Sequence, residues 1–160
     1  MKIGSAEFII ENYQFHTMLI QRYTDGISHQ ESEWQLPFPH NCLNWIVGHI
    51  AANRSHVLEV VAADHTWMEA VRNRYHQDTP PVNPENPGLD LGNLLAYISE
   101  SDRLLASRLA EIPEADLDQN FTNYRGQKNL RTHLTGFHWH EAFHIGQVEL
   151  LRTFIIDRRS

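Results

Sequence analysis

A long apolar seam near the end of the chain most constrains its fold. The members of this seam recur at alternating steps of three and four residues, the spacing of one face of a packed α-helix. They are Leu130, His133, Phe137, His140, His144, Val148, Leu151 and Ile155. The spacing predicts a helix over about 129–156 that buries this face against other helices.

Three more long helices are predicted before this seam. They span about 5–25, 44–63 and 91–112. Ser5 can cap the first of them and Asp90 the last, which Pro113 ends. A shorter, more polar helix is expected over 66–75.

The connecting segments carry residues that interrupt helices. Residues 76–89 hold four prolines and a glycine, which cannot continue a helix. The polar segment 114–128 is expected to be irregular, with a turn at 124–127. Because no strand alternation and no internal repeat are visible, the predicted fold class is all-α. The 160 residues are predicted to form a single domain, 1–160.

Composition excludes several classes of partner. The chain has 13 Lys and Arg against 20 Asp and Glu, a net charge of −7, which argues against nucleic-acid or anionic-membrane binding. No run approaches the roughly 20 apolar residues of a membrane-spanning helix. The single cysteine, Cys42, allows no intrachain disulfide, and the N-terminus lacks the apolar segment of a signal peptide. A cytoplasmic location is therefore expected.

The 11 histidines are the unusual feature of this composition. His140 and His144 lie one helical turn apart on the buried seam, so both imidazoles can reach one ion. A buried imidazole without a partner is costly, and a shared metal would remove that cost. His49 lies on the inward face of the second long helix, next to Gly48, which permits close approach of a neighbouring backbone. The sequence therefore predicts a divalent transition metal on His49, His140 and His144, with at least one coordination position open.

The segment 140–144 also matches H-E-x-x-H, a zinc metalloprotease motif. The extended form of that motif needs a glycine and a histidine where this chain has Gln147 and Leu150. A protease also needs an exposed strand to align its peptide, and none is predicted. Glu141 is therefore expected to support the site indirectly or to face solvent, rather than to act as a general base.

Four other histidines have weaker claims to the site. His133 and His56 each lie seven residues from a predicted ligand, about 10 Å along a helix axis, which is too far to share the ion. Both are expected to be core or surface residues that could line a pocket. His138 points away from the seam. His16, on the first helix, is a candidate for a further ligand or a pocket acid.

Two segments of the chain resemble the DinB-like superfamily, whose members include metalloenzymes. They are residues 44–50, which read NWIVGHI, and residues 140–147, which read HEAFHIGQ. The resemblance covers nearly the whole chain and implies a four-helix bundle with up-down-down-up connectivity. It implies nickel or zinc on His49, His140 and His144, and a homodimer. Some relatives transfer low-molecular-weight thiols, such as bacillithiol or mycothiol.

Three functional hypotheses follow from these observations. The leading one is a metal-dependent enzyme that transfers a low-molecular-weight thiol to a small electrophilic substrate. A metal-dependent hydrolase would use the same three ligands. The third is a non-catalytic, stress-related bundle that binds a ligand. An open coordination position facing a cavity favours an enzyme, whereas a fourth protein ligand or a cavity filled by aromatic side chains favours the non-catalytic bundle.

Overall fold

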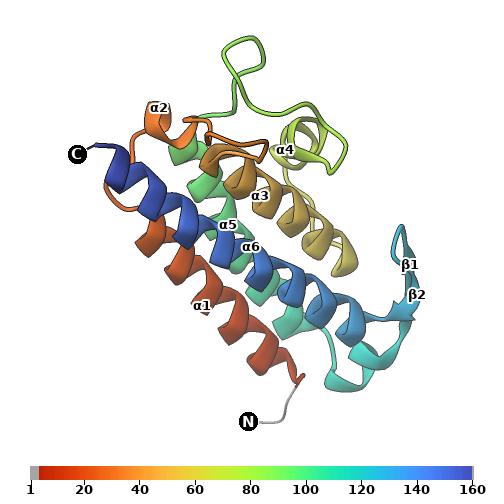
Figure 1. Cartoon of the computed structure of the whole chain (residues 1–160). Coiled ribbons are helices and arrows are strands. Elements are labelled where there is room, and N and C mark those ends of the chain that lie inside the picture. The colour runs from red at the N-terminus through yellow and green to blue at the C-terminus, as the bar shows by residue number, and fades with distance from the viewer. Residues whose placement is uncertain (1–3, 160) are drawn as a thin grey trace.

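The computed structural model describes residues 4–159 and consists mostly of helices (Figure 1). The four long helices are α1 (Ala6–Thr24), α3 (Leu43–Val60), α5 (Leu91–Glu111) and α6 (Leu130–Arg158). The shorter elements are α2 (His29–Ser32), α4 (Met68–Tyr75), the 3-10 turn η1 (Glu114–Asp118) and the strands β1 (Asn120–Asn123) and β2 (Gly126–Asn129). The all-α prediction is therefore right for the bulk of the chain.

The four long helices pack around one core. Helices α1 and α3 each contact both α5 and α6, and α4 covers a further side of α3. Helix α3 is buried on nearly every side, as expected for a helix whose apolar residues are not confined to one stripe. This central position places His49 inside the protein rather than on its surface.

Hydrogen bonds near the helix ends fix which ends lie together. The Arg131 guanidinium at the start of α6 donates to the Gly4 carbonyl, just before α1. The Asn44 side-chain amide at the start of α3 donates to the Leu89 carbonyl, just before α5, at 2.9 Å. Helices α1 and α6 therefore begin beside each other, and so do α3 and α5.

The predicted caps are confirmed. Ser5 Oγ accepts from the Phe8 amide at 3.2 Å, and Asp90 Oδ1 accepts from the Asn93 amide at 2.9 Å. In each case the side chain accepts a hydrogen bond from a backbone amide that has no partner within the first turn of its helix.

None of the helices within residues 4–159 has the length and hydropathy needed to cross a membrane.

One prediction about the connecting segments is wrong. Residues 120–129 form an antiparallel hairpin in which Asn120 pairs with Asn129, whereas no strand was expected. Its strands have only four residues each and are too polar to give an apolar alternation. The loop after α1 contains the one-turn helix α2, which Ser28 and Glu31 stabilise through a reciprocal capping box.

Candidate metal centre

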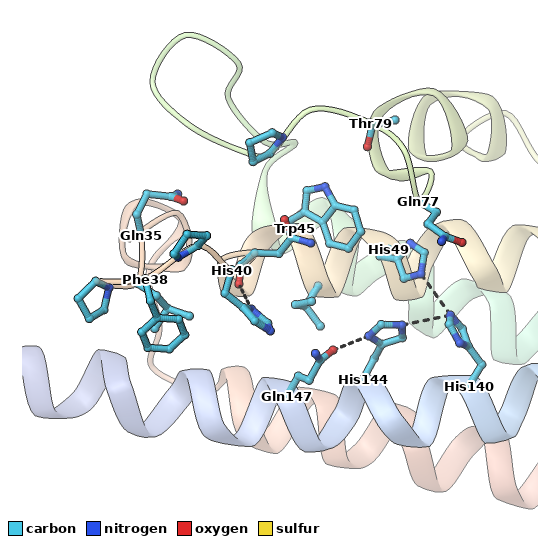
Figure 2. A pocket seen from close by; sticks show the side chains of 16 residues that line it. Gln35, Phe38, His40, Trp45, His49, Gln77, Thr79, His140, His144 and Gln147 are labelled. Carbon is cyan, nitrogen blue, oxygen red and sulfur yellow. Dashed lines mark hydrogen bonds between the residues drawn. The ribbon is translucent and has the colours of Figure 1, made fainter.

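Three histidines from two facing helices converge at one end of a pocket (Figure 2). His49 comes from α3, and His140 and His144 come from successive turns of α6. His49 and His144 are buried, whereas His140 is partly exposed. The structure therefore brings together the three residues that the sequence singled out.

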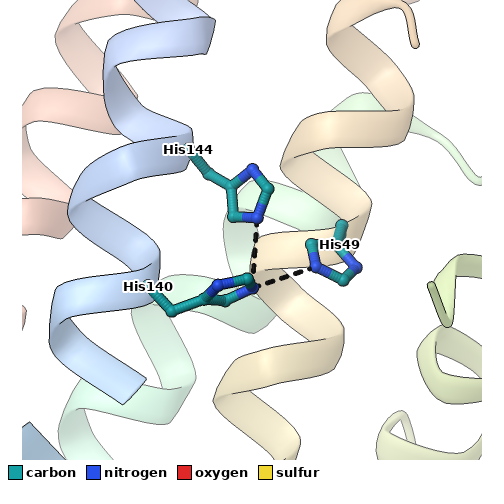
Figure 3. A group of neighbouring side chains, drawn as sticks. All are labelled: His49, His140 and His144. Carbon is teal, nitrogen blue, oxygen red and sulfur yellow. Dashed lines mark hydrogen bonds between the residues drawn. The ribbon is translucent and has the colours of Figure 1, made fainter. Parts of the chain in front are cut away.

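The three imidazoles turn the same ring nitrogen toward one another (Figure 3). His140 Nε2 lies 3.2 Å from His49 Nε2 and 3.1 Å from His144 Nε2. Nitrogens held about 2.0–2.1 Å from one tetrahedral ion would lie about 3.3 Å apart. One ligand atom from each ring lies within 4.8 Å of the other two. The spacing of the rings therefore fits a single ion.

The outer nitrogens of two rings are held by hydrogen-bond acceptors. His49 Nδ1 donates to the Tyr75 carbonyl at 2.8 Å, and His144 Nδ1 donates to Gln147 Oε1 at 2.6 Å. With the proton on Nδ1, each Nε2 presents a lone pair to His140 Nε2, which can donate to only one of them. A cation between the rings would remove the repulsion between the Nε2 lone pairs, and a hydrogen-bond acceptor on the outer nitrogen is typical of metal-ligating histidines.

Burial keeps these rings in the neutral form that binds metals. It is the largest cause of the lowered pKa of His49 and of His140, and it lowers the pKa of His144 to about 4. Near neutral pH a metal ion would therefore not have to displace a proton from a charged imidazole.

A pocket of about 900 Å³ opens from the histidines toward the surface (Figure 2). Its far end is formed by the 35–41 segment, where Phe38 lies. The Trp45 indole stacks on the His49 ring, with centroids 4.9 Å apart, and fixes its plane. Among residues 4–159, no fourth histidine, cysteine or carboxylate joins the cluster. The site therefore has three potential ligands and a cavity beside them.

Comparison with known proteins identifies the family. The family model of the DinB superfamily matches residues 12–148. The chain belongs to the DinB superfamily. Among solved structures, a conserved protein from Enterococcus faecalis shares the fold, with a TM-score of 0.73 and 18% identity over 98% of this chain and 99% of that one. No curated protein matches this DinB-superfamily chain.

Glu141 of this DinB-superfamily chain takes no part in the histidine cluster. The suggestion that it faces solvent is wrong, because it is 1% exposed. Its carboxylate accepts from Arg54 Nε at 2.6 Å and from Arg54 Nη2 at 2.7 Å. Burial alone would raise the pKa of this carboxyl, but Arg54 and His16 outweigh it and lower the pKa to about 2. A carboxylate held in this way is unsuited to act as a general base.

The remaining histidines lie outside the cluster. The interpretation of His16 as a ligand or pocket acid is wrong, because its Nδ1 lies 3.1 Å from Glu141 Oε1 and its ring stacks on His138. His133 is buried and bonds the Phe121 carbonyl through Nε2 at 2.9 Å. His56 bonds Glu59 and lines a second, smaller cavity.

Tyr75 and Gln147 hold the histidine cluster in place through hydrogen bonds to His49 and His144. The sequence analysis predicted neither role. Gln147 could have been found from its spacing, three residues after His144 on the same helix. Tyr75 carries no such signal, because it comes from the separate helix α4. The backbone contact expected at Gly48 is instead a side-chain contact, since a β-carbon there would lie 2.4 Å from the Tyr75 ring.

Proposed function

We propose that this protein is a metal-dependent enzyme that holds one divalent transition ion, nickel or zinc, on His49, His140 and His144. The observation that carries the proposal is the convergence of three Nε2 atoms, two of them with their lone pairs directed inward by partners on Nδ1. Imidazole ligands suit zinc, nickel, copper and iron alike, and the choice of nickel or zinc rests on the resemblance to the DinB-like superfamily.

A catalytic role is favoured over a purely structural metal. Structural zinc sites are closed by four protein ligands, whereas catalytic sites keep a position open. Here three candidate ligands border a pocket of about 900 Å³, and the described residues supply no fourth. A bound divalent ion would supply Lewis acidity, which lowers the pKa of a thiol or a water molecule.

We infer that the substrate is a low-molecular-weight thiol that is transferred to an electrophile. Membership of the DinB superfamily supports this class, since the family resemblance includes thiol transferases. The pocket would accommodate such a molecule, because Gln35, Asn41 and Gln77 offer amide donors and acceptors along its wall. The indole of Trp45 would keep His49 in place and exclude water from that side of the ring.

Metal uptake tests the site directly. The purified protein should carry close to one equivalent of nickel or zinc by elemental analysis. His140→Ala should lose the metal and retain its helical circular dichroism, whereas His56→Ala, outside the cluster, should retain both. A wild-type chain that stays empty when offered zinc, nickel, cobalt and manganese in turn would overturn the proposal.

Thiol binding tests the substrate class. Bacillithiol or mycothiol should bind the metal-loaded protein more tightly than the metal-free protein in calorimetric titrations. Equal affinity for the two forms would contradict thiol activation at the metal. Hydrolysis of ester or amide substrates by the loaded protein without any added thiol would favour the hydrolase instead.

We also propose an up-down-down-up bundle for this single domain. Helices α1 and α6 begin beside each other, and so do α3 and α5, which supports this connectivity.

We also propose that the protein is a homodimer. This is supported by large apolar side chains that α6 exposes, namely Trp139, Phe143 and Leu150. Leu150→Glu should shift the sedimentation coefficient to that of a monomer, and a wild-type protein that already sediments as a monomer would contradict the dimer.

A further inference from the structure

A second cavity, of about 190 Å³, shares His49 and His140 with the larger pocket. Its wall is completed by α4 and by the turn between β1 and β2. The side chains that matter for its chemistry are Asn53, His56, Arg72, Tyr124 and Arg125. The candidate metal centre therefore lies where two cavities of different size and composition meet.

The smaller cavity carries positive charge although the whole protein is acidic, whereas no arginine, lysine, aspartate or glutamate of the described residues lines the larger pocket. The chain has 20 acidic residues and a net charge of −7. Yet no aspartate or glutamate within residues 4–159 lines either cavity, whereas Arg72 and Arg125 both line the smaller one. An acidic protein that keeps carboxylates away from a pocket and places arginines there favours an anionic ligand.

Arg125 is the cation that is free to bind such a ligand. No carboxylate of the described residues forms an ion pair with its guanidinium, which lies 4.5 Å over the Phe137 ring. The guanidinium also lies beside Gly136, where an added β-carbon would meet Arg125 Nη1 at 3.8 Å, an ordinary van der Waals contact.

The second arginine of the smaller cavity, Arg72, has its charge already compensated by other residues. It donates to Ser55 Oγ at 2.7 Å and to the Ser55 carbonyl at 2.9 Å, and it pairs with Glu59 at 3.2 Å. The cavity therefore offers about one uncompensated positive charge. A single guanidinium matches a monoanionic carboxylate, which it binds through two parallel hydrogen bonds.

We propose that the smaller cavity is a subsite for a carboxylate group of the substrate, with Arg125 as its main partner. The proposal rests on the proposed function, because the reacting end of the same molecule would lie at the histidine cluster. The substrate class is then a low-molecular-weight thiol that also bears a carboxylate, with this carboxylate in the Arg125 cavity and the bulkier part of the molecule in the wide pocket. Arg125 would then select for substrates that carry a carboxylate.

Acetate binding to the metal-free protein tests this subsite, and acetamide serves as its uncharged isostere. Acetate should shift the NMR signals of the Arg125 Nε–H and of the Tyr124 and Arg125 amides with a saturable curve, whereas acetamide should not. Arg125→Gln should weaken acetate binding about tenfold or more, because a charge-assisted pair is lost. Arg103→Gln, which removes an exposed arginine on α5, should leave the affinity unchanged.

Three outcomes would overturn the proposal. The first is an equal response to acetate and acetamide. The second is unchanged acetate affinity in an Arg125→Gln protein that retains its circular dichroism and melting temperature. The third is phosphate binding more tightly than acetate at the same signals, which would assign the cavity to a phosphoryl group. Because the protein is metal-free throughout, these outcomes are independent of whether the histidines take up a metal.

Discussion

Arg54 on α3 forms a two-pronged ion pair with Glu141 on α6 in the centre of the bundle, at 2.6 and 2.7 Å. Both side chains are almost completely buried. The other donors of the guanidinium reach Asp102 Oδ1 on α5 at 2.5 Å and the Tyr13 carbonyl on α1 at 3.0 Å. One arginine therefore links all four long helices and fixes their register beside the histidine cluster.

Removal of either member of this pair should strongly destabilise the fold. Glu141→Gln leaves the Arg54 charge buried with less compensation, and Arg54→Met leaves the Glu141 carboxylate without its main partner. We expect each change to lower the free energy of unfolding by about 3–5 kcal/mol. Urea denaturation followed by circular dichroism measures the loss.

Two comparisons make this prediction specific. Arg103→Gln breaks the exposed pair with Glu100 on α5 and should leave the urea midpoint nearly unchanged. The double variant Arg54→Met, Glu141→Met should recover part of the stability, because neither member of the fully buried pair is left without its partner and only the less buried Asp102 loses the contact with Arg54. Single variants as stable as the wild type would show that the pair does not hold the helices together.

The metal-free protein should lose stability as the pH falls from about 6.5 to 4. Burial is the main reason that the pKa of His138 and that of His144 are each lowered from 6.5 to about 4. In this window the unfolded chain binds protons that the folded chain does not, so the free energy of unfolding falls with pH. Above pH 6.5 both states are neutral at these rings and the contribution is complete.

Urea midpoints measured in chelator at pH 7.5, 6, 5 and 4.5 test this dependence. The midpoint should decrease steadily below pH 6.5, and His138→Gln should flatten part of the decrease. A midpoint that stays constant down to pH 4.5 would mean that these rings are not held neutral by burial.

The sequence predicts the long helices and the histidine cluster because both depend on local spacing. The seam that ends at Ile155 has the period of one helix face, so α6 and its inward side follow directly. His140 and His144 meet because residues four apart share a helix face. His49 could be added because it lies on a face that must turn inward.

What could not be predicted depends on contacts between distant segments. Arg54 and Glu141 are 87 residues apart, and nothing in either neighbourhood indicates that they would pair. Glu141 lies one residue after His140 and so points to another side of α6, which could face solvent. Only the position of α3 beside that side of the helix buries the Glu141 carboxylate. The small cavity is likewise absent from local patterns, because Arg125 reaches it from a hairpin that has no apolar alternation.

Gly48→Ala should destabilise the protein and weaken the metal site together. The added β-carbon would lie 2.4 Å from the Tyr75 ring, so Tyr75 would have to move. The Tyr75 carbonyl accepts from His49 Nδ1, and its hydroxyl donates to Asn44, so both contacts would be disturbed. We expect a loss of about 1–3 kcal/mol in the free energy of unfolding and weaker metal binding.

Gly146→Ala is the matched control on α6. A β-carbon at Gly146 meets no atom within 4 Å, and the residue is exposed in the interior of the helix. This change should raise the free energy of unfolding by about 0.5–1 kcal/mol, because alanine loses less backbone entropy. Similar effects of the two substitutions would contradict the steric role of Gly48.

Gln147→Leu should weaken metal binding without unfolding the protein. Gln147 Oε1 accepts from His144 Nδ1 at 2.6 Å and so keeps the proton off the nitrogen that faces the other two rings. Leucine removes that acceptor, and loss of such a partner typically lowers metal affinity about 10–100-fold. Competition with a chromogenic chelator for zinc measures the change independently of any activity.

Gln147→Glu separates the hydrogen bond from the shape of the side chain. A carboxylate at this position can still accept from His144 Nδ1, and its charge makes the imidazole a stronger electron donor to a metal. Zinc affinity should therefore be retained or raised in Gln147→Glu, whereas Gln14→Leu, on the exposed side of α1, should leave it unchanged. If leucine and glutamate at position 147 weaken zinc binding equally, Gln147 acts through packing and not through the proton on His144.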